Sequence, residues 1–136
     1  MLIHKMQKKL LGNKKEMIRM HEKEPKKAKN IFNRILNRDL LNLYCDQNVI
    51  SFHVNNDGKL WKFTKKGYEF TGKILKEEVM DLINRISLEV DEVINVTNPI
   101  LFVEFPNNTI FTGIIPPVSV DFPIFSIEKN IGSEEK

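Results

Sequence analysis

The chain has 136 residues, an apolar content of 41% and a formal net charge of +3. Its length fits one domain that buries about two-thirds of its unfolded surface, and its nine phenylalanines argue against a disordered chain. The lone Cys45 excludes an internal disulfide, and no stretch reaches the roughly 18 uncharged apolar residues of a membrane span. Because the N-terminus also lacks an uninterrupted apolar signal region, we expect a cytoplasmic protein.

Positive charge is concentrated in the N-terminal part of the chain. Residues 1–38 carry twelve Lys or Arg against three Glu, which leaves residues 39–136 net negative. We predict a basic helical arm over residues 1–30, with these cations among its members: Lys8, Lys9, Lys14, Lys15, Arg19, Lys26 and Lys27. Such an arm is attracted to anionic lipid, to nucleic acid or to an acidic subunit, unless it is only a solvated helical face.

The first half of the remaining chain is predicted as a helix followed by three strands. Apolar residues recur at helical spacing from Ala28 to Leu43, so we expect one helix that begins near Pro25 and ends near Asp46. Alternating or turn-bounded segments then predict strands over residues 49–55, 59–64 and 68–70. The Asn-Asn-Asp-Gly turn at residues 55–58 joins the first two as a hairpin.

The second half repeats this pattern with one helix and three strands. Apolar spacing predicts a helix over residues 75–90, and strands are expected over residues 100–105, 109–115 and 124–129. The first of these strands is apolar on both faces except at Glu104, which predicts a central, doubly covered strand. The fold class is therefore α+β, in the order ααβββαβββ, with a mostly antiparallel sheet of about six strands. We place the domain at residues 31–130 and a disordered tail at 131–136.

One segment imitates a nucleotide-binding motif. Gly67 to Lys73 satisfies the spacing G-x-x-x-x-G-K, but Ile74 stands where the magnesium-binding Ser or Thr belongs. Bulky residues occupy its interior, where a phosphate cradle needs small ones, so we interpret it as a strand and turn. We predict no catalytic residue, no metal and no cofactor. An intrinsic ATPase activity would require this segment to bind the phosphates of a nucleotide.

Three sequence blocks carry a family resemblance, at residues 46–56, 98–109 and 115–129. In that order they resemble blocks of the N-terminal domain of the traffic ATPases of type II and type IV secretion, conjugation and Tad-pilus systems. The resemblance runs from about residue 31 to 129 and lacks the RecA-like ATPase domain. The residues that match the family phrases, and that we expect to shape its loops, are Asn98, Pro99, Pro106, Pro116, Pro117, Asp121 and Pro123.

The resemblance implies a domain that forms one tier of a hexameric ring above a RecA-like tier. In that family, arginines of the N-terminal domain approach the nucleotide phosphates, since a guanidinium meets phosphate oxygens in bidentate fashion. Here Ile110 and Glu128 stand at the matching positions, and Phe122 replaces a glycine. Lys129 is the one neighbouring cation that would partly substitute. The nucleotide-facing positions are thus expected to be degenerate.

We therefore expect a non-catalytic oligomerisation or interaction domain of a bacterial secretion or conjugation ATPase. Such a chain would be a domain fragment, a truncated product or a degenerate stand-alone paralogue. Its partners would be copies of itself or a RecA-like subunit, with the basic arm reaching the inner membrane. An apolar excess predicts an exposed contact patch formed by Phe102, Phe111, Phe122 and Phe125.

The alternative is a nucleic-acid-binding accessory protein that uses the basic arm. Trp61 with Lys59 and Lys62 would add a stacking strip, although a Trp on a hairpin more often packs against its own sheet. Binding to nucleic acid through phosphate contacts would be steeply salt-dependent.

Overall fold

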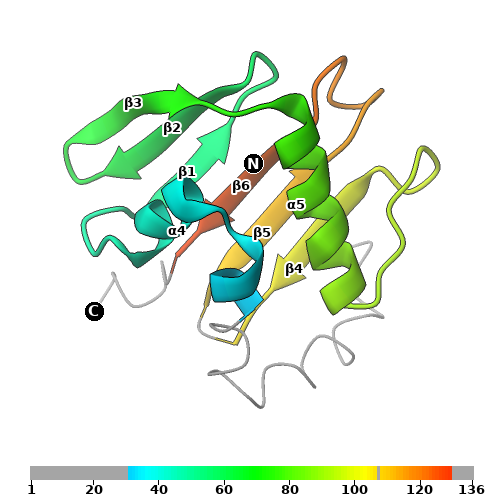
Figure 1. The fold of residues 1–136 in the computed structure, drawn as a ribbon, viewed down its shortest axis with the longest axis horizontal. Helices are drawn as coiled ribbons and strands as arrows, with labels where there is room; N and C mark the ends of the chain where they lie inside the picture. The colour runs from blue at the N-terminus through cyan, green and yellow to red at the C-terminus, as the bar shows by residue number, and fades with distance from the viewer. Residues whose placement is uncertain (1–30, 107, 130–136) are drawn as a thin grey trace.

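A computed structural model describes residues 31–106 and 108–129 of the chain (Figure 1). The predicted basic arm, its helix and the C-terminal tail lie outside these residues. Residues 31–35 are helical. They precede, in chain order, α4 (Arg38–Cys45), β1 (Ser51–Val54), β2 (Lys59–Thr64), β3 (Gly67–Lys73), α5 (Lys76–Glu89), β4 (Ile100–Glu104), β5 (Ile110–Ile114) and β6 (Ile124–Glu128).

The six strands form one antiparallel sheet in the order β3-β2-β1-β6-β5-β4. Each half of the chain contributes three adjacent strands, and the halves meet where β1 pairs with β6. Both helices lie on one face of this sheet (Figure 1). We call this the helix face and the opposite side the open face. The predicted α+β class and element order are confirmed for the described residues.

The core lies between the helix face and the helices. Along one row of the register, the inward-facing positions from β2 to β4 are Leu60, Val54, Phe125, Gly113 and Leu101. At Gly113 an added Cβ would lie 3.0 Å from the Cγ1 atom of Ile83. The absence of a side chain there lets α5 approach the middle of the sheet closely.

Both helices start from local sequence signals. The side chain of Asn37 accepts a hydrogen bond from the backbone N–H of Leu40 at 2.9 Å and so caps α4. At the start of α5, the Glu78 side chain accepts from the backbone N–H of Leu75 at 3.0 Å. Glu77 and Glu78 also place negative charge at the favourable end of the helix. The apolar stripe of α5 then buries Val79, Leu82, Ile83 and Ile86.

Two expectations about these elements are wrong. The predicted helix from Pro25 to Asp46 is interrupted at Leu36–Asn37, because the Asn37 side chain caps a new helix there. Strand β4 lies at the edge of the described sheet, not at its centre, since β6 pairs with both β5 and β1. Residues 101–103 are nevertheless buried on both faces, as their apolar sequence predicts.

The predicted exposed phenylalanine patch is also wrong. Phe102, Phe111 and Phe125 are only 3%, 0% and 2% exposed, and Phe122 packs partly buried against the core. Phe111 and Phe125 stack with ring centroids 6.2 Å apart on the helix face. Phe111 and Phe125 belong to the core under the helices, whereas Phe102 is buried on the opposite face of β4. Large apolar side chains are exposed at other places, which are described below.

Candidate functional site

The two positions that the resemblance aligns with nucleotide-facing arginines lie side by side. Ile110 of β5 is the register partner of Glu128 of β6, and both belong to the open face. On its other side Ile110 pairs with Glu104 of β4. The neutral Ile110 is therefore flanked by two carboxylates. Glu104 is a neighbour that the sequence argument missed, although it was the single polar residue noted in that strand.

Lys129 binds the C-terminal end of helix α4. Its Nζ donates to the backbone carbonyls of Leu43, Tyr44 and Asp46 at 3.0, 2.9 and 2.7 Å. These carbonyls end α4, where unpaired acceptors and the helix dipole favour a cation. Burial lowers the pKa of Lys129 below its ordinary value of 10.5, while the charge of Asp46 opposes that shift. The suggestion that Lys129 substitutes for a phosphate-binding arginine does not agree with these contacts.

Hydrogen bonds join two of the three family-like blocks. The Asn95 side chain accepts from the backbone N–H groups of Thr97 and Asn98, which folds the turn before Pro99. The carbonyl of Pro99 then accepts from the N–H of Ile115 at 2.9 Å. This bond ties the start of β4 to the start of the Pro116–Pro117 loop. The Asn-Pro and Ile-Pro-Pro phrases thus shape one end of the sheet.

The Pro116–Pro117 loop ends at Phe122, which covers the β1–β2 turn. The peptide bond between the two prolines is cis. Gly58, at a φ of 80°, leaves little space for a side chain, because an added Cβ would lie 3.2 Å from the Phe122 ring and 3.1 Å from the carbonyl oxygen of Ile74. Pro123 is buried and Asp121 is exposed. A bulky residue at position 122 is therefore a packing element that the glycine of the family phrase would not provide.

Three exposed apolar side chains belong to the two segments that meet at this turn. Val118 and Val120 of the loop and Leu75 beside Ile74 are each more than half exposed. Val120 has a φ of 73°, a left-handed conformation that is unfavourable for a β-branched residue. Such strain persists where the surrounding structure holds it and often marks a contact site. We call Leu75, Val118 and Val120 the loop-end surface.

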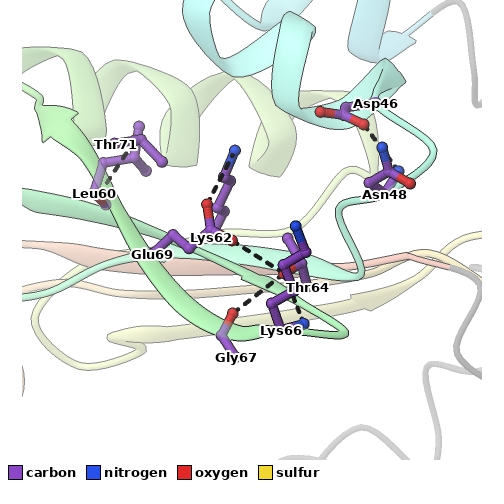
Figure 2. Close-up of polar contacts among 9 residues, drawn as sticks. All are labelled: Asp46, Asn48, Leu60, Lys62, Thr64, Lys66, Gly67, Glu69 and Thr71. Carbon is purple, nitrogen blue, oxygen red and sulfur yellow. Dashed lines mark hydrogen bonds and ion pairs between the residues drawn. The ribbon is translucent and has the colours of Figure 1, made fainter.

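The segment that imitates a P-loop is strand β3. Gly67–Lys73 pairs along its length with β2, so its backbone is extended and does not form a phosphate cradle. Glu69 lies 3.7 Å from the Nζ of Lys62, and its carboxylate accepts from the Thr64 hydroxyl at 3.3 Å (Figure 2). Thr71 also donates its hydroxyl proton to the Leu60 carbonyl at 3.3 Å. The polar groups of this segment serve the hairpin itself.

The open face of β1–β3 carries an aromatic surface, of which only Trp61 was considered from the sequence, as a stacking residue or as hairpin packing. We define the aromatic face as His53, Trp61, Phe63, Tyr68 and Phe70, which pair across the three strands. Trp61 contacts Phe70 and Phe63 contacts Tyr68, with ring centroids 5.5 and 4.8 Å apart. His53 meets Tyr68 edge to face at 5.8 Å, and burial lowers the pKa of His53 below 6.5. The Trp61 Nε1 atom is buried and has no hydrogen-bond partner among residues 31–106 and 108–129.

Two common kinds of site are not found in the part of the chain that the structure describes. No group of three or more His, Cys, Asp or Glu side chains there is arranged to hold a metal ion. None of the helices within residues 31–106 and 108–129 has the length and apolar character to cross a membrane.

Known proteins that match this chain are found among the solved structures. No protein-family model matches the sequence, and no curated protein matches it significantly. Among solved structures, the chain is similar to the VirB11 ATPase from the Brucella suis type IV secretion system, solved in complex with sulphate. The TM-score is 0.60 at 19% identity, over 66% of this chain and 28% of that chain. The present chain therefore shares its fold with part of a secretion ATPase and spans little more than a quarter of its length.

Proposed function

We propose that this protein is a non-catalytic assembly domain of a bacterial secretion or conjugation system, which binds copies of itself or a RecA-like ATPase subunit. The observation that carries the proposal is a fold similarity confined to 28% of the VirB11 chain. The three family-like blocks agree with it, because they occur in the order that the resemblance implies. At 19% identity the fold is the shared property, and the role is our inference from it.

The charges around Ile110 support a role without catalysis. Glu128 lies beside Ile110, the position where the resemblance implies a phosphate-binding arginine, and itself stands at the second such position. A unit charge about 5 Å from a like charge costs about 3 kcal/mol at an effective dielectric constant of about 20. Lys129 is held by three backbone carbonyls of α4 and does not offset this repulsion. This end of the sheet is unfavourable for a triphosphate.

The loop-end surface is the contact surface we propose for assembly. Its three side chains, Leu75, Val118 and Val120, are exposed and apolar. The backbone at Val120 is strained, with a φ of 73°. Exposed apolar patches on a protein surface are typical of protein contact sites. The buried Phe102, Phe111 and Phe125 support the sheet and do not themselves form this surface.

The test combines light scattering with co-purification of the protein with a RecA-like secretion ATPase. We expect either a defined oligomer or a stable complex. Substituting both Leu75→Asp and Val118→Asp should weaken that association at least tenfold. The control is Leu88→Asp on α5, which is 80% exposed and lies outside the loop-end surface. A strictly monomeric protein that does not bind the ATPase would refute the proposal.

The cytoplasmic location and the basic arm remain predictions. Residues 1–30 carry the cations that we expect to attract an inner membrane or an acidic subunit, and they lie outside the described residues. Flotation with anionic vesicles, compared between the full chain and a variant with Lys14 and Lys15 changed to Gln, measures that attraction.

A further inference from the structure

The aromatic face presents two flat rings to solvent on a rigid support. Tyr68 is 65% exposed and Phe70 is 52% exposed, and both project from β3 next to partly buried rings of β2. The cross-strand contacts hold Tyr68 against Phe63 and Phe70 against Trp61, so the exposed rings have limited freedom. Aromatic rings fixed in this way lose little entropy when a flat ligand stacks on them.

Lysines border this face at both ends of the hairpin. Lys59 and Lys73 pair at one end, and Lys65 and Lys66 form the turn at the other, with all four side chains exposed. The β1–β3 segment, residues 51–73, contains five lysines and two acids. One acid, Asp57, accepts from the backbone N–H of Lys59, and the other, Glu69, contacts Lys62 on the helix face. The aromatic face is therefore positively charged along both borders.

The exposed rings and the bordering lysines favour one of three possible partners for the aromatic face. A second copy docked through the same face would bring lysines against lysines, since a two-fold contact places like patches together. A lipid bilayer would have to accept the polar backbone groups of β3, which has a strand partner on one side only within the described sheet. A single-stranded nucleic acid offers flat bases and a regular row of negative charges, which match both features.

We propose that the aromatic face of β1–β3 binds single-stranded nucleic acid, with bases stacked on Tyr68 and Phe70 and phosphates near the bordering lysines. Side chains two residues apart on a strand are about 6.6 Å apart. This is about twice the 3.4 Å spacing of stacked bases, so the bound strand is extended. The distance along β2 from Lys59 to Lys65 is about 20 Å, which fits about three nucleotides.

The site does not depend on the assembly role proposed above. It lies on the half of the sheet away from Ile110 and Glu128, and it uses neither the loop-end surface nor the positions matched to the nucleotide-facing arginines. The test below uses no ATPase, so its failure and the failure of the assembly proposal are distinguishable.

The experiment uses the full chain and the fluorescence of Trp61, the single tryptophan of the sequence. An eight-nucleotide oligothymidine is added while Trp61 emission is recorded, and anisotropy of a labelled oligonucleotide gives the Kd. We expect saturable quenching of Trp61. Because base stacking on aromatic side chains is lost in both positions, the double variant Tyr68→Leu, Phe70→Leu should weaken binding at least tenfold.

Three comparisons make the result specific. The variant Tyr68→Phe, Phe70→Tyr keeps both rings and should bind within twofold of the unmodified protein. The control variant Leu88→Ala, Val96→Ala removes exposed apolar side chains elsewhere and should leave the Kd unchanged. Substituting Lys65→Gln and Lys66→Gln should reduce the slope of log affinity against log salt by about 1.4, the value for two phosphate contacts of a single strand. Any binding by residues 1–30 is common to all variants.

Several outcomes would overturn the proposal. Equal affinity of the leucine variant and the unmodified protein would show that the rings do not stack. Anisotropy that saturates without any change in Trp61 emission would place the binding elsewhere. A response of Trp61 to vesicles with 30% phosphatidylglycerol, and not to the oligonucleotide, would assign the face to lipid. Dimer dissociation in the leucine variant without an effect on oligonucleotide binding would assign it to a second copy.

Discussion

The two halves of the sheet have the same topology, but their side chains on the open face differ in chemistry. Each is a three-stranded antiparallel unit, and the register continues across the β1–β6 junction. One row of the open face crosses all six strands in the order Tyr68, Phe63, Ser51, Glu128, Ile110 and Glu104. The row thus changes from aromatic residues to carboxylates around a single aliphatic residue within one continuous sheet.

The loop residues that identify the fold and the surface residues suited to bind a ligand lie in different halves of the sheet. The Asn-Pro and Ile-Pro-Pro phrases lie at the ends of the β4–β6 half, where they close loops and cover the core. The exposed aromatic residues and most of the lysines of the sheet lie in the β1–β3 half. The Asn-Pro and Ile-Pro-Pro phrases therefore maintain the architecture. The surface suited to an anionic partner lies outside them, and only His53 of that surface belongs to a family-like block, residues 46–56.

The largest expected difference between the halves is in core stability. Phe111→Ala should lower the free energy of unfolding by about 3–5 kcal/mol, because the ring is fully buried and stacked on Phe125. Phe70→Ala should change it by less than about 0.5 kcal/mol, since that ring is half exposed. Urea denaturation measures both values. Equal losses would contradict the assignment of Phe70 to a surface and Phe111 to the core.

A smaller effect is expected at Lys129. Lys129→Met removes three hydrogen bonds to the end of α4 and should cost about 1–2 kcal/mol, because the lysine is partly buried and water replaces some of the contacts. The control Lys73→Met removes an exposed lysine from the other half and should cost less than about 0.5 kcal/mol. Similar melting temperatures for the two variants would show that Lys129 does not hold α4.

The smallest effect is a pH dependence from His53. Its pKa is below 6.5 in the folded protein because of burial, whereas the unfolded chain has the ordinary value. The unfolded state therefore binds the proton first as the pH falls, so the contribution of His53 is complete above 6.5 and decreases below it. Chemical denaturation between pH 7.5 and 5 should show this loss, and His53→Gln should reduce it. An unchanged pH profile in that variant would contradict the assignment.

The element types could be predicted because local signals agree with the structure. Residues 55–58 form the expected turn, and the apolar stripe of α5 is buried. The Gly67–Lys73 segment is a strand and not a phosphate loop. The break at Asn37 was missed, since a capping side chain within an apolar periodic segment leaves the period unchanged. The edge position of β4 was missed for another reason. Strand order depends on the pairing of β1 with β6, which are distant in sequence.

The candidate sites were harder to predict because they depend on register. Ile110 and Glu128 were chosen by alignment to the family phrases, but the presence of Glu104 beside them follows only from the pairing of β4 with β5. Lys129 was considered as a phosphate ligand, and its three carbonyl partners come from a helix more than 80 residues away in sequence. The exposure of Tyr68 and Phe70 likewise depends on which face the helices cover.

Hydrogen–deuterium exchange with and without the RecA-like ATPase tests the central claim most directly. The proposed assembly role predicts slower exchange in residues 115–123, which contain most of the loop-end surface, and unchanged exchange in β3. Protection confined to β3, or no protection at any described residue in a protein that is also monomeric, would contradict the assembly role.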